Sequence, residues 1–152
     1  MEKKEFLNFL KNYFKFHGFE KGKGSRYYKN NTENKFLCEV DIFKSNYGDF
    51  YYVECAFYLG EFERPYVLDH GQDATCTPFI FKRFVFDDKN CASFCNYLEY
   101  SEEHLRKMLD ENMERLIFPP FSVGKKYLRE NLGTLYRNFL PEERVLPLLY
   151  DT

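Results

Sequence analysis

The chain has 152 residues, of which 44% are hydrophobic and 30% are charged. This length and balance are typical of one globular domain that buries roughly 70% of its extended surface on folding. We therefore expect a single domain over residues 1–152. The formal net charge of -2 and the pI near 6.0 exclude a strongly basic protein, so no nucleic-acid partner is expected.

The sequence also constrains where the protein works. No apolar run approaches the length of a membrane span, so we expect no membrane association. The first residues lead into an amphipathic pattern and lack the apolar core of a signal peptide. Five cysteines, an odd number, without an export signal predict reduced thiols in a cytoplasmic protein. No cofactor motif is present, and we expect none to be bound.

An amphipathic helix is predicted over residues 1–17, where apolar side chains recur at intervals of three and four. Gly18 is predicted to end this helix, and Phe19 to fold back onto its last turn. After a glycine-rich turn, residues 26–29 are predicted to form a short edge strand.

Two strands are predicted over residues 36–43 and 50–59, because apolar residues alternate in each run. One side is fully apolar, and we expect it to form the core. It consists of Phe36, Cys38, Val40, Ile42, Tyr51, Val53, Cys55, Phe57 and Leu59. The opposite side combines carboxylates with phenols and is the least ordinary surface of the chain. Its candidate binding residues are Glu39, Asp41, Tyr52, Glu54 and Tyr58.

A long connection over residues 60–78 follows, and connections of this length are often functional or mobile. It contains Asp69, His70 and Asp73, in which carboxylates flank an imidazole that is suited to a base or a ligand. These three residues form an alternative candidate site. A third strand is predicted over residues 79–86, and we expect Lys82 or Arg83 to pair with a carboxylate across the sheet.

The remaining chain is predicted to be helical. Ser101 has the features of an N-cap, and Pro119 with Pro120 is expected to end the helix that it starts. Ser122 is expected to cap a second helix, and Pro141 to mark the start of a last one. The predicted fold is α+β, with a mainly antiparallel sheet of three to four strands packed against the N-terminal helix and the C-terminal helices.

The sequence also resembles a known family. The marks are His17-Gly18-Phe19, Arg26-Tyr27-Tyr28, Phe43-Lys44-Ser45 followed by Tyr47-Gly48, and a tail of two helices. Together they resemble the bacterial family catalogued as domain of unknown function 4304, best over residues 5–59. The resemblance implies an α+β fold and a bacterial source. It implies no activity, cofactor or site residue.

The leading functional hypothesis is a non-catalytic binding module that holds a protein partner on its aromatic and acidic sheet face. Exposed aromatic clusters commonly mark interfaces. A toxin-neutralising protein and a self-associating protein are two forms of this hypothesis. A third outcome is that the tail helices cover this face.

The alternative hypothesis is a metal-dependent hydrolase or nuclease with its carboxylates on the same face. Such enzymes often place an acid on one strand and Glu-x-Lys on the next. Here the second strand reads Glu54-Cys55-Ala56, so Lys82 would have to supply the cation. No set of residues has a recognised metal-ligand spacing, and no metal site is assigned.

Overall fold

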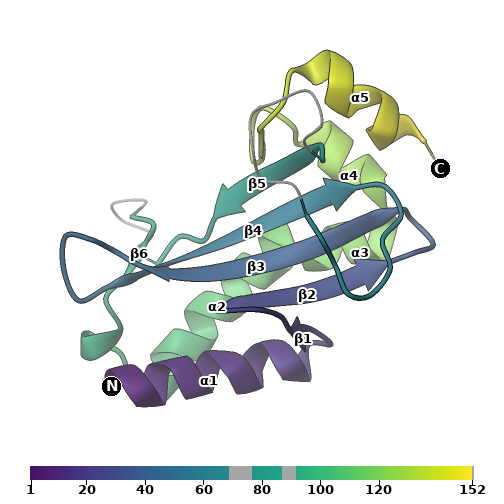
Figure 1. The fold of residues 1–152 in the computed structure, drawn as a ribbon. Helices are drawn as coiled ribbons and strands as arrows, with labels where there is room; N and C mark the ends of the chain where they lie inside the picture. Colours follow the sequence, from purple (N-terminus) through teal and green to yellow (C-terminus); the bar gives the residue numbers. More distant parts are fainter. Residues whose placement is uncertain (69–76, 87–91, 152) are drawn as a thin grey trace.

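The computed structural model describes residues 1–68, 77–86 and 92–151. An antiparallel sheet lies against a layer of helices, as the sequence predicts (Figure 1). The helices are α1 (Lys3–Phe16), a 3-10 turn (Tyr97–Glu99), α2 (Glu102–Leu116), α3 (Phe118–Val123), α4 (Lys125–Glu130) and α5 (Glu142–Tyr150). The strands are β1 (Glu20–Lys21), β2 (Arg26–Asn31), β3 (Phe36–Lys44), β4 (Tyr51–Leu59), β5 (Phe79–Arg83), β6 (Phe94–Cys95) and β7 (Arg137–Asn138).

Over the described residues, the sheet has seven strands in the order β1-β2-β3-β4-β5-β7, and β6 pairs with the start of β4. The four strands β2 to β5 correspond to the predicted three to four. The three additional strands have two residues each, too few to show an alternating pattern.

Helix α1 ends as predicted, in a motif that uses glycine at positive φ. Gly18 has φ 86°, and the Phe19 amide donates to the Phe14 carbonyl at 2.9 Å. The two phenyl rings also pack together, with centroids 5.6 Å apart. The hydrogen bond satisfies an otherwise orphaned helix carbonyl, and the ring contact directs the chain into β1.

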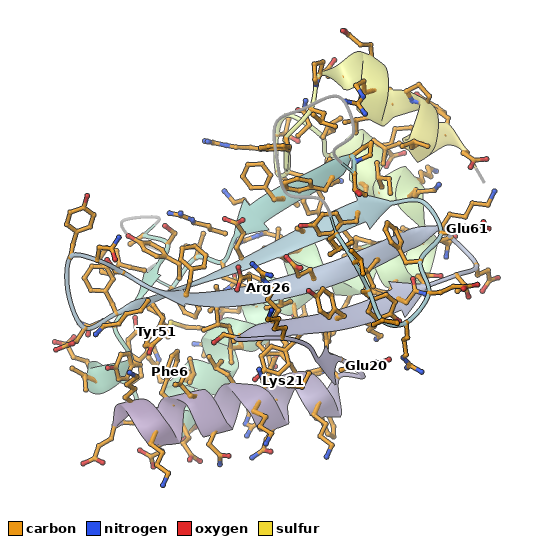
Figure 2. All side chains as sticks on the ribbon, viewed as in Figure 1. Phe6, Glu20, Lys21, Arg26, Tyr51 and Glu61 are labelled. Carbon is orange, nitrogen blue, oxygen red and sulfur yellow. The ribbon has the colours of Figure 1, made fainter. Side chains whose placement is uncertain are left out.

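The main core lies between the helices and one face of the sheet, and it contains the predicted apolar side of β3 and β4. Val40 and Val53 are completely buried. Phe6 of α1 packs on Tyr51 of β4, with ring centroids 5.4 Å apart (Figure 2). Strict alternation therefore identified the core face of both strands correctly.

The start of α2 is confirmed, since Ser101 Oγ accepts a hydrogen bond from the His104 amide at 3.1 Å. The end of α2 is confirmed as well, because α2 ends at Leu116, shortly before Pro119 and Pro120. The cap expected at Ser122 was wrong. Pro119 and Pro120 lie in the first turn of α3, where a proline loses no helical hydrogen bond. Gly124, and not Ser122, precedes α4. Pro141 does lie directly before α5. Among the described helices, none has the length and apolarity needed to span a bilayer.

The tail helices do not cover the second face of the sheet. Their buried residues belong to the main core. A smaller apolar cluster instead lies on the second face beneath residues 60–68, which we call the capping segment. Figure 1 shows this segment passing in front of β2 and β3 after the end of β4. The cover extends over part of the face only, which defines the candidate site.

Candidate functional site

The second sheet face consists of two halves. In the capped half, the apolar side chains of Phe62, Tyr66 and Leu68 from the capping segment pack on the sheet. The sheet residues beneath them are Tyr28, Leu37, Ala56, Tyr58 and Phe79, and Glu39, which contacts Tyr58, is buried as well. The open half lies nearer the β3–β4 hairpin and is not covered by this segment.

Four charged residues form a row across the open half, one on each of four neighbouring strands. The strand register places Arg26 of β2 opposite Asp41 of β3. Asp41 is opposite Glu54 of β4, which in turn is opposite Arg83 of β5. We call these residues the charged row. Its sign sequence is positive, negative, negative, positive, and Figure 2 shows Arg26 on this face of the sheet.

Each carboxylate of the charged row has an arginine on its outer side. The Arg26 and Asp41 side chains form an ion pair at 3.8 Å, and the Arg83 and Glu54 side chains form one at 3.4 Å. The second pair confirms the predicted cross-strand ion pair. All four side chains keep some solvent exposure, so each pair contributes under about 1 kcal/mol to stability.

Glu54 lies in an unfavourable position for a charged carboxylate. Burial raises its pKa above the ordinary value, and Arg83, which lowers the pKa, offsets this only in part. The charges of Asp41 and Glu39 raise the pKa further. Two acids directly opposite each other on neighbouring strands repel. The folded protein therefore maintains a carboxylate pair at some cost in stability.

An aromatic cluster adjoins the charged row and fixes Arg83 in place. The Arg83 guanidinium lies 4.3 Å from the ring centroid of Tyr52 and 5.3 Å from that of Phe43. Phe50 and Phe94 extend the cluster, with their ring centroids 5.1 Å apart. Phe94 is 43% exposed. The guanidinium is thus held by a carboxylate and by two aromatic rings.

The predicted site residues divide between the two halves. Asp41, Tyr52 and Glu54 lie in the open half and are partly accessible. Glu39 and Tyr58 are 5% and 1% exposed, so the prediction that they belong to a contact surface needs correction. The Tyr58 hydroxyl donates to Glu39 Oε1 at 3.4 Å in the interior. Burial raises the pKa of Tyr58, which keeps this phenol protonated.

Sequence reasoning missed two residues of the open half, Arg26 and Phe94, and one contact of Arg83. Arg26 was assigned to a strand but not to the site, because register cannot be read from an isolated strand. The stacking of Arg83 on Tyr52 depends on the same register. Phe94 comes from the two-residue strand β6, which has no sequence pattern of its own. The alternative site residues Asp69, His70 and Asp73 lie outside the described residues.

The register also bears on the nuclease-like arrangement. Lys82 is opposite Cys55, whose side chain lies in the main core, while Arg83 is on the face of the carboxylates. Lys82 therefore lies on the opposite face of the sheet from Glu54, which does not suit a Glu-x-Lys arrangement. Among the described residues, no three His, Cys, Asp or Glu side chains are grouped as a metal site would require.

The described cysteines are not placed as nucleophiles or ligands. Cys38, Cys55 and Cys95 are buried free thiols. Burial raises the pKa of all three, to about 12 for Cys55. A thiol with a raised pKa is not ionised at neutral pH and is a poor nucleophile. These residues serve as small apolar groups in the core.

Comparison with known proteins places this arrangement in a family. No curated protein and no solved structure matches the chain. A family model does match over residues 10–113, which is more than half of the 152-residue chain. The matched region runs from α1 into α2 and includes the whole charged row and the capping segment. The chain therefore belongs to the family described as Domain of unknown function (DUF4304).

Proposed function

We propose that the protein is a non-catalytic binding module whose contact surface for a protein partner is the open half of the sheet face. The observation that carries the proposal is the fixed Arg83 side chain, which lies between Glu54 and the Tyr52 ring beside an exposed Phe94. Arginine and tyrosine are enriched among the residues that dominate binding energy at protein interfaces.

The fixed geometry supports this role because ordering a side chain costs binding energy. A free arginine loses rotamer freedom when a partner immobilises it, at a cost of about 0.5–1.5 kcal/mol. Arg83 is already held by an ion pair and two rings before a partner arrives. The surface therefore presents a preformed cation between aromatic rings and acids.

The charge order of the row favours a different protein over a second copy of this chain. The sequence of signs is the same when read from either end, positive, negative, negative, positive. If two copies packed face to face about a two-fold axis with their rows superimposed, like charges would meet at every position. Like charges brought together in an interface cost several kcal/mol. A partner with the opposite order of signs avoids this cost.

No observation on the described residues favours the hydrolase or nuclease hypothesis to the same degree. The two carboxylates of the charged row, Asp41 and Glu54, form ion pairs with arginines. Lys82 lies on the opposite face of the sheet. We therefore propose binding without catalysis. A toxin-neutralising role is one biological form that such binding would take.

The test is to capture partners from the source organism with the tagged protein, and then to measure binding of the purified partner by calorimetry. Arg83→Glu should weaken the affinity at least about tenfold, as expected for a central interface arginine. Tyr52→Ala and Glu54→Ala should also weaken it without unfolding the protein.

Arg106→Glu is the matched control. Arg106 is also an exposed arginine stacked on an aromatic ring, 4.9 Å from the centroid of Phe9, but it lies on α2 in the helix layer. Its substitution should leave the affinity within about twofold. Equal losses for Arg83→Glu and Arg106→Glu would reject the open half as the contact surface. If the wild type is a dimer and Arg83→Glu dissociates it, the partner on this surface is a second copy of the chain.

A further inference from the structure

A groove on the helix side of the sheet is separate from the open half. It lies between α1 and the strands β1 to β3 and has a volume of about 1190 Å³. Its floor is apolar and includes Leu7 of α1, Tyr27 of β2 and Ile42 of β3. Tyr27 and Ile42 point into the main core, whereas the open half uses the other face of the same strands.

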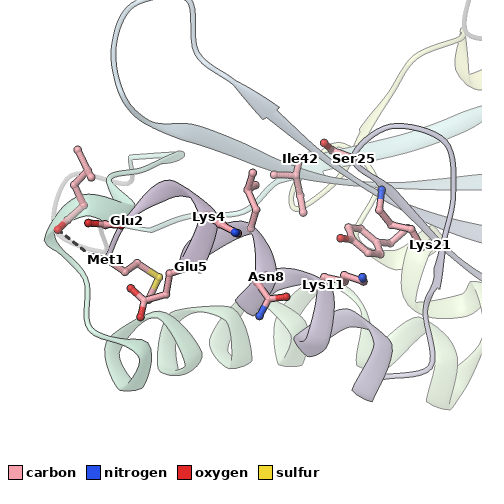
Figure 3. A pocket seen from close by; sticks show the side chains of 12 residues that line it. Met1, Glu2, Lys4, Glu5, Asn8, Lys11, Lys21, Ser25 and Ile42 are labelled. Atoms are coloured by element: carbon pink, nitrogen blue, oxygen red, sulfur yellow. Dashed lines mark hydrogen bonds between the residues drawn. The ribbon is translucent and has the colours of Figure 1, made fainter.

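Three lysines surround this floor. Lys4 and Lys11 are seven residues apart on α1, so they lie about two helical turns apart on one side of the helix. Lys21 comes from β1 on the other side of the groove (Figure 3). Its ammonium group contacts the Gly24 carbonyl and lies 5.2 Å from the centroid of the Tyr27 ring. Lys21 is therefore held beside the floor.

The three positive charges are not neutralised within the described part of the chain. None of Lys4, Lys11 and Lys21 forms an ion pair with a described carboxylate. The acids that line the groove are Glu2 and Glu5, at the start of α1. The middle and the β1 end of the groove therefore have a net positive charge above an apolar floor.

The shape of the groove indicates the size of its ligand. Several lining side chains, among them Asn8 and Ser25, are exposed to solvent, so the groove is open along its length. Small-molecule sites usually enclose most of the ligand surface. An open groove suits a chain segment that lies along it. An extended segment rises about 3.3 Å per residue, so about three to four residues cover the distance from Lys4 to Lys11.

We propose that this groove binds a short, extended, acidic peptide segment of a partner protein. One apolar side chain of the segment contacts the floor at Leu7, and flanking Asp or Glu side chains reach the lysines. The apolar contact supplies affinity through burial, and the charge complementarity supplies specificity and a fast encounter. This proposal does not depend on the open half.

The test uses a fluorescein-labelled peptide of roughly eight residues, long enough to cross the groove when extended. It carries one central leucine flanked on both sides by aspartates and glutamates. Fluorescence polarisation with the full-length protein should show saturable binding that weakens with salt. A second peptide, with Asn and Gln in place of Asp and Glu, should bind at least about tenfold more weakly.

Matched protein variants locate the binding. Lys11→Gln combined with Lys21→Gln should weaken the acidic peptide about tenfold, since two exposed charge pairs are lost. Lys3→Gln combined with Lys15→Gln removes the same charge from α1 at positions that do not line the groove. These control changes should alter the affinity by no more than about twofold.

Three results would overturn the proposal. The first is equal weakening by both pairs of substitutions, or equal binding of the neutral peptide. The second is an absence of peptide binding by the wild type while vesicles of phosphatidylserine and phosphatidylcholine do bind. The third is a wild-type dimer, seen by sedimentation, that dissociates when Lys11 and Lys21 are substituted, because a second copy would then occupy the groove.

Discussion

The two halves of one sheet face have similar amino acids and opposite environments. Each half combines a phenol with a carboxylate: Tyr58 with Glu39 in the capped half, and Tyr52 beside Glu54 in the open half. The capping segment seals the first pair, with Tyr58 at 1% exposure. The second pair stays accessible and is engaged by Arg83. Amino-acid composition alone therefore does not determine which half can act as a contact surface. The capping segment determines which half a partner can reach.

The two halves should differ most in the stability that is lost when the tyrosine of each half is replaced by alanine. Tyr58→Ala deletes a ring that is buried beneath the capping segment, and it should lower the free energy of unfolding by about 3–5 kcal/mol. Tyr52→Ala deletes a partly exposed ring and should cost about 1 kcal/mol. Urea denaturation of both variants measures the difference. Similar costs for the two substitutions would show that the halves do not differ as described.

Weakening the cap should make the two halves more alike. Phe62→Ala removes an apolar contact of the capping segment and should cost about 1–2 kcal/mol. It should also let tetranitromethane nitrate Tyr58, which is 1% exposed in the wild type and should not react there. Mass spectrometry of peptides measures the nitration. Phe16→Ala is the control, because Phe16 is 84% exposed on α1. A Tyr58 that reacts in the wild type would contradict the sealed half.

Glu54 should give the open half a distinct pH dependence. Its pKa is raised in the folded protein, chiefly by burial. Its contribution to stability is therefore fully present below the ordinary pKa of the unfolded state and is lost as the pH rises through the raised value.

Glu54→Gln removes this dependence. The stability of the variant relative to the wild type should thus improve between about pH 3 and about pH 7, by under about 1 kcal/mol because the site is partly solvated. Denaturation at the two pH values measures the change. If the relative stability falls over this range, the charge of Arg83 lowers the pKa of Glu54 by more than burial raises it.

The smallest expected effect is at the other end of the charged row. Arg26→Ala removes an exposed pair with Asp41 at 3.8 Å and should change the free energy of unfolding by less than about 0.5 kcal/mol. Thermal denaturation should show a shift of at most a few degrees. A large loss would assign Arg26 a structural role in the capped half instead.

Much of the fold was predictable because its signals are local. Alternation in β3 and β4 gave their buried face, since the side-chain period of a strand is two. Ser101 gave the start of α2 through its capping hydroxyl. Gly18 gave the end of α1 through its positive φ. Each of these signals depends only on residues near one another in the sequence.

The division of the second face was not predictable because it depends on tertiary packing. Phe62, Tyr66 and Leu68 lie in a connection without periodicity, and nothing local indicates that they pack on Tyr58. The charged row required the register of four strands at once. Pro119 and Pro120 indicated the end of α2 correctly, but not the start of α3, since a proline is also well suited to the first turn of a helix.

The most direct test of the central claim is photo-crosslinking from the two halves in cells of the source organism. Benzoylphenylalanine would replace Tyr52 in the open half or Val67 on the capping segment, which is 82% exposed on the same face. The proposal predicts a discrete protein adduct from position 52 that disappears with Arg83→Glu, and none from position 67. An adduct from position 67 alone, or from both positions regardless of Arg83, would contradict it.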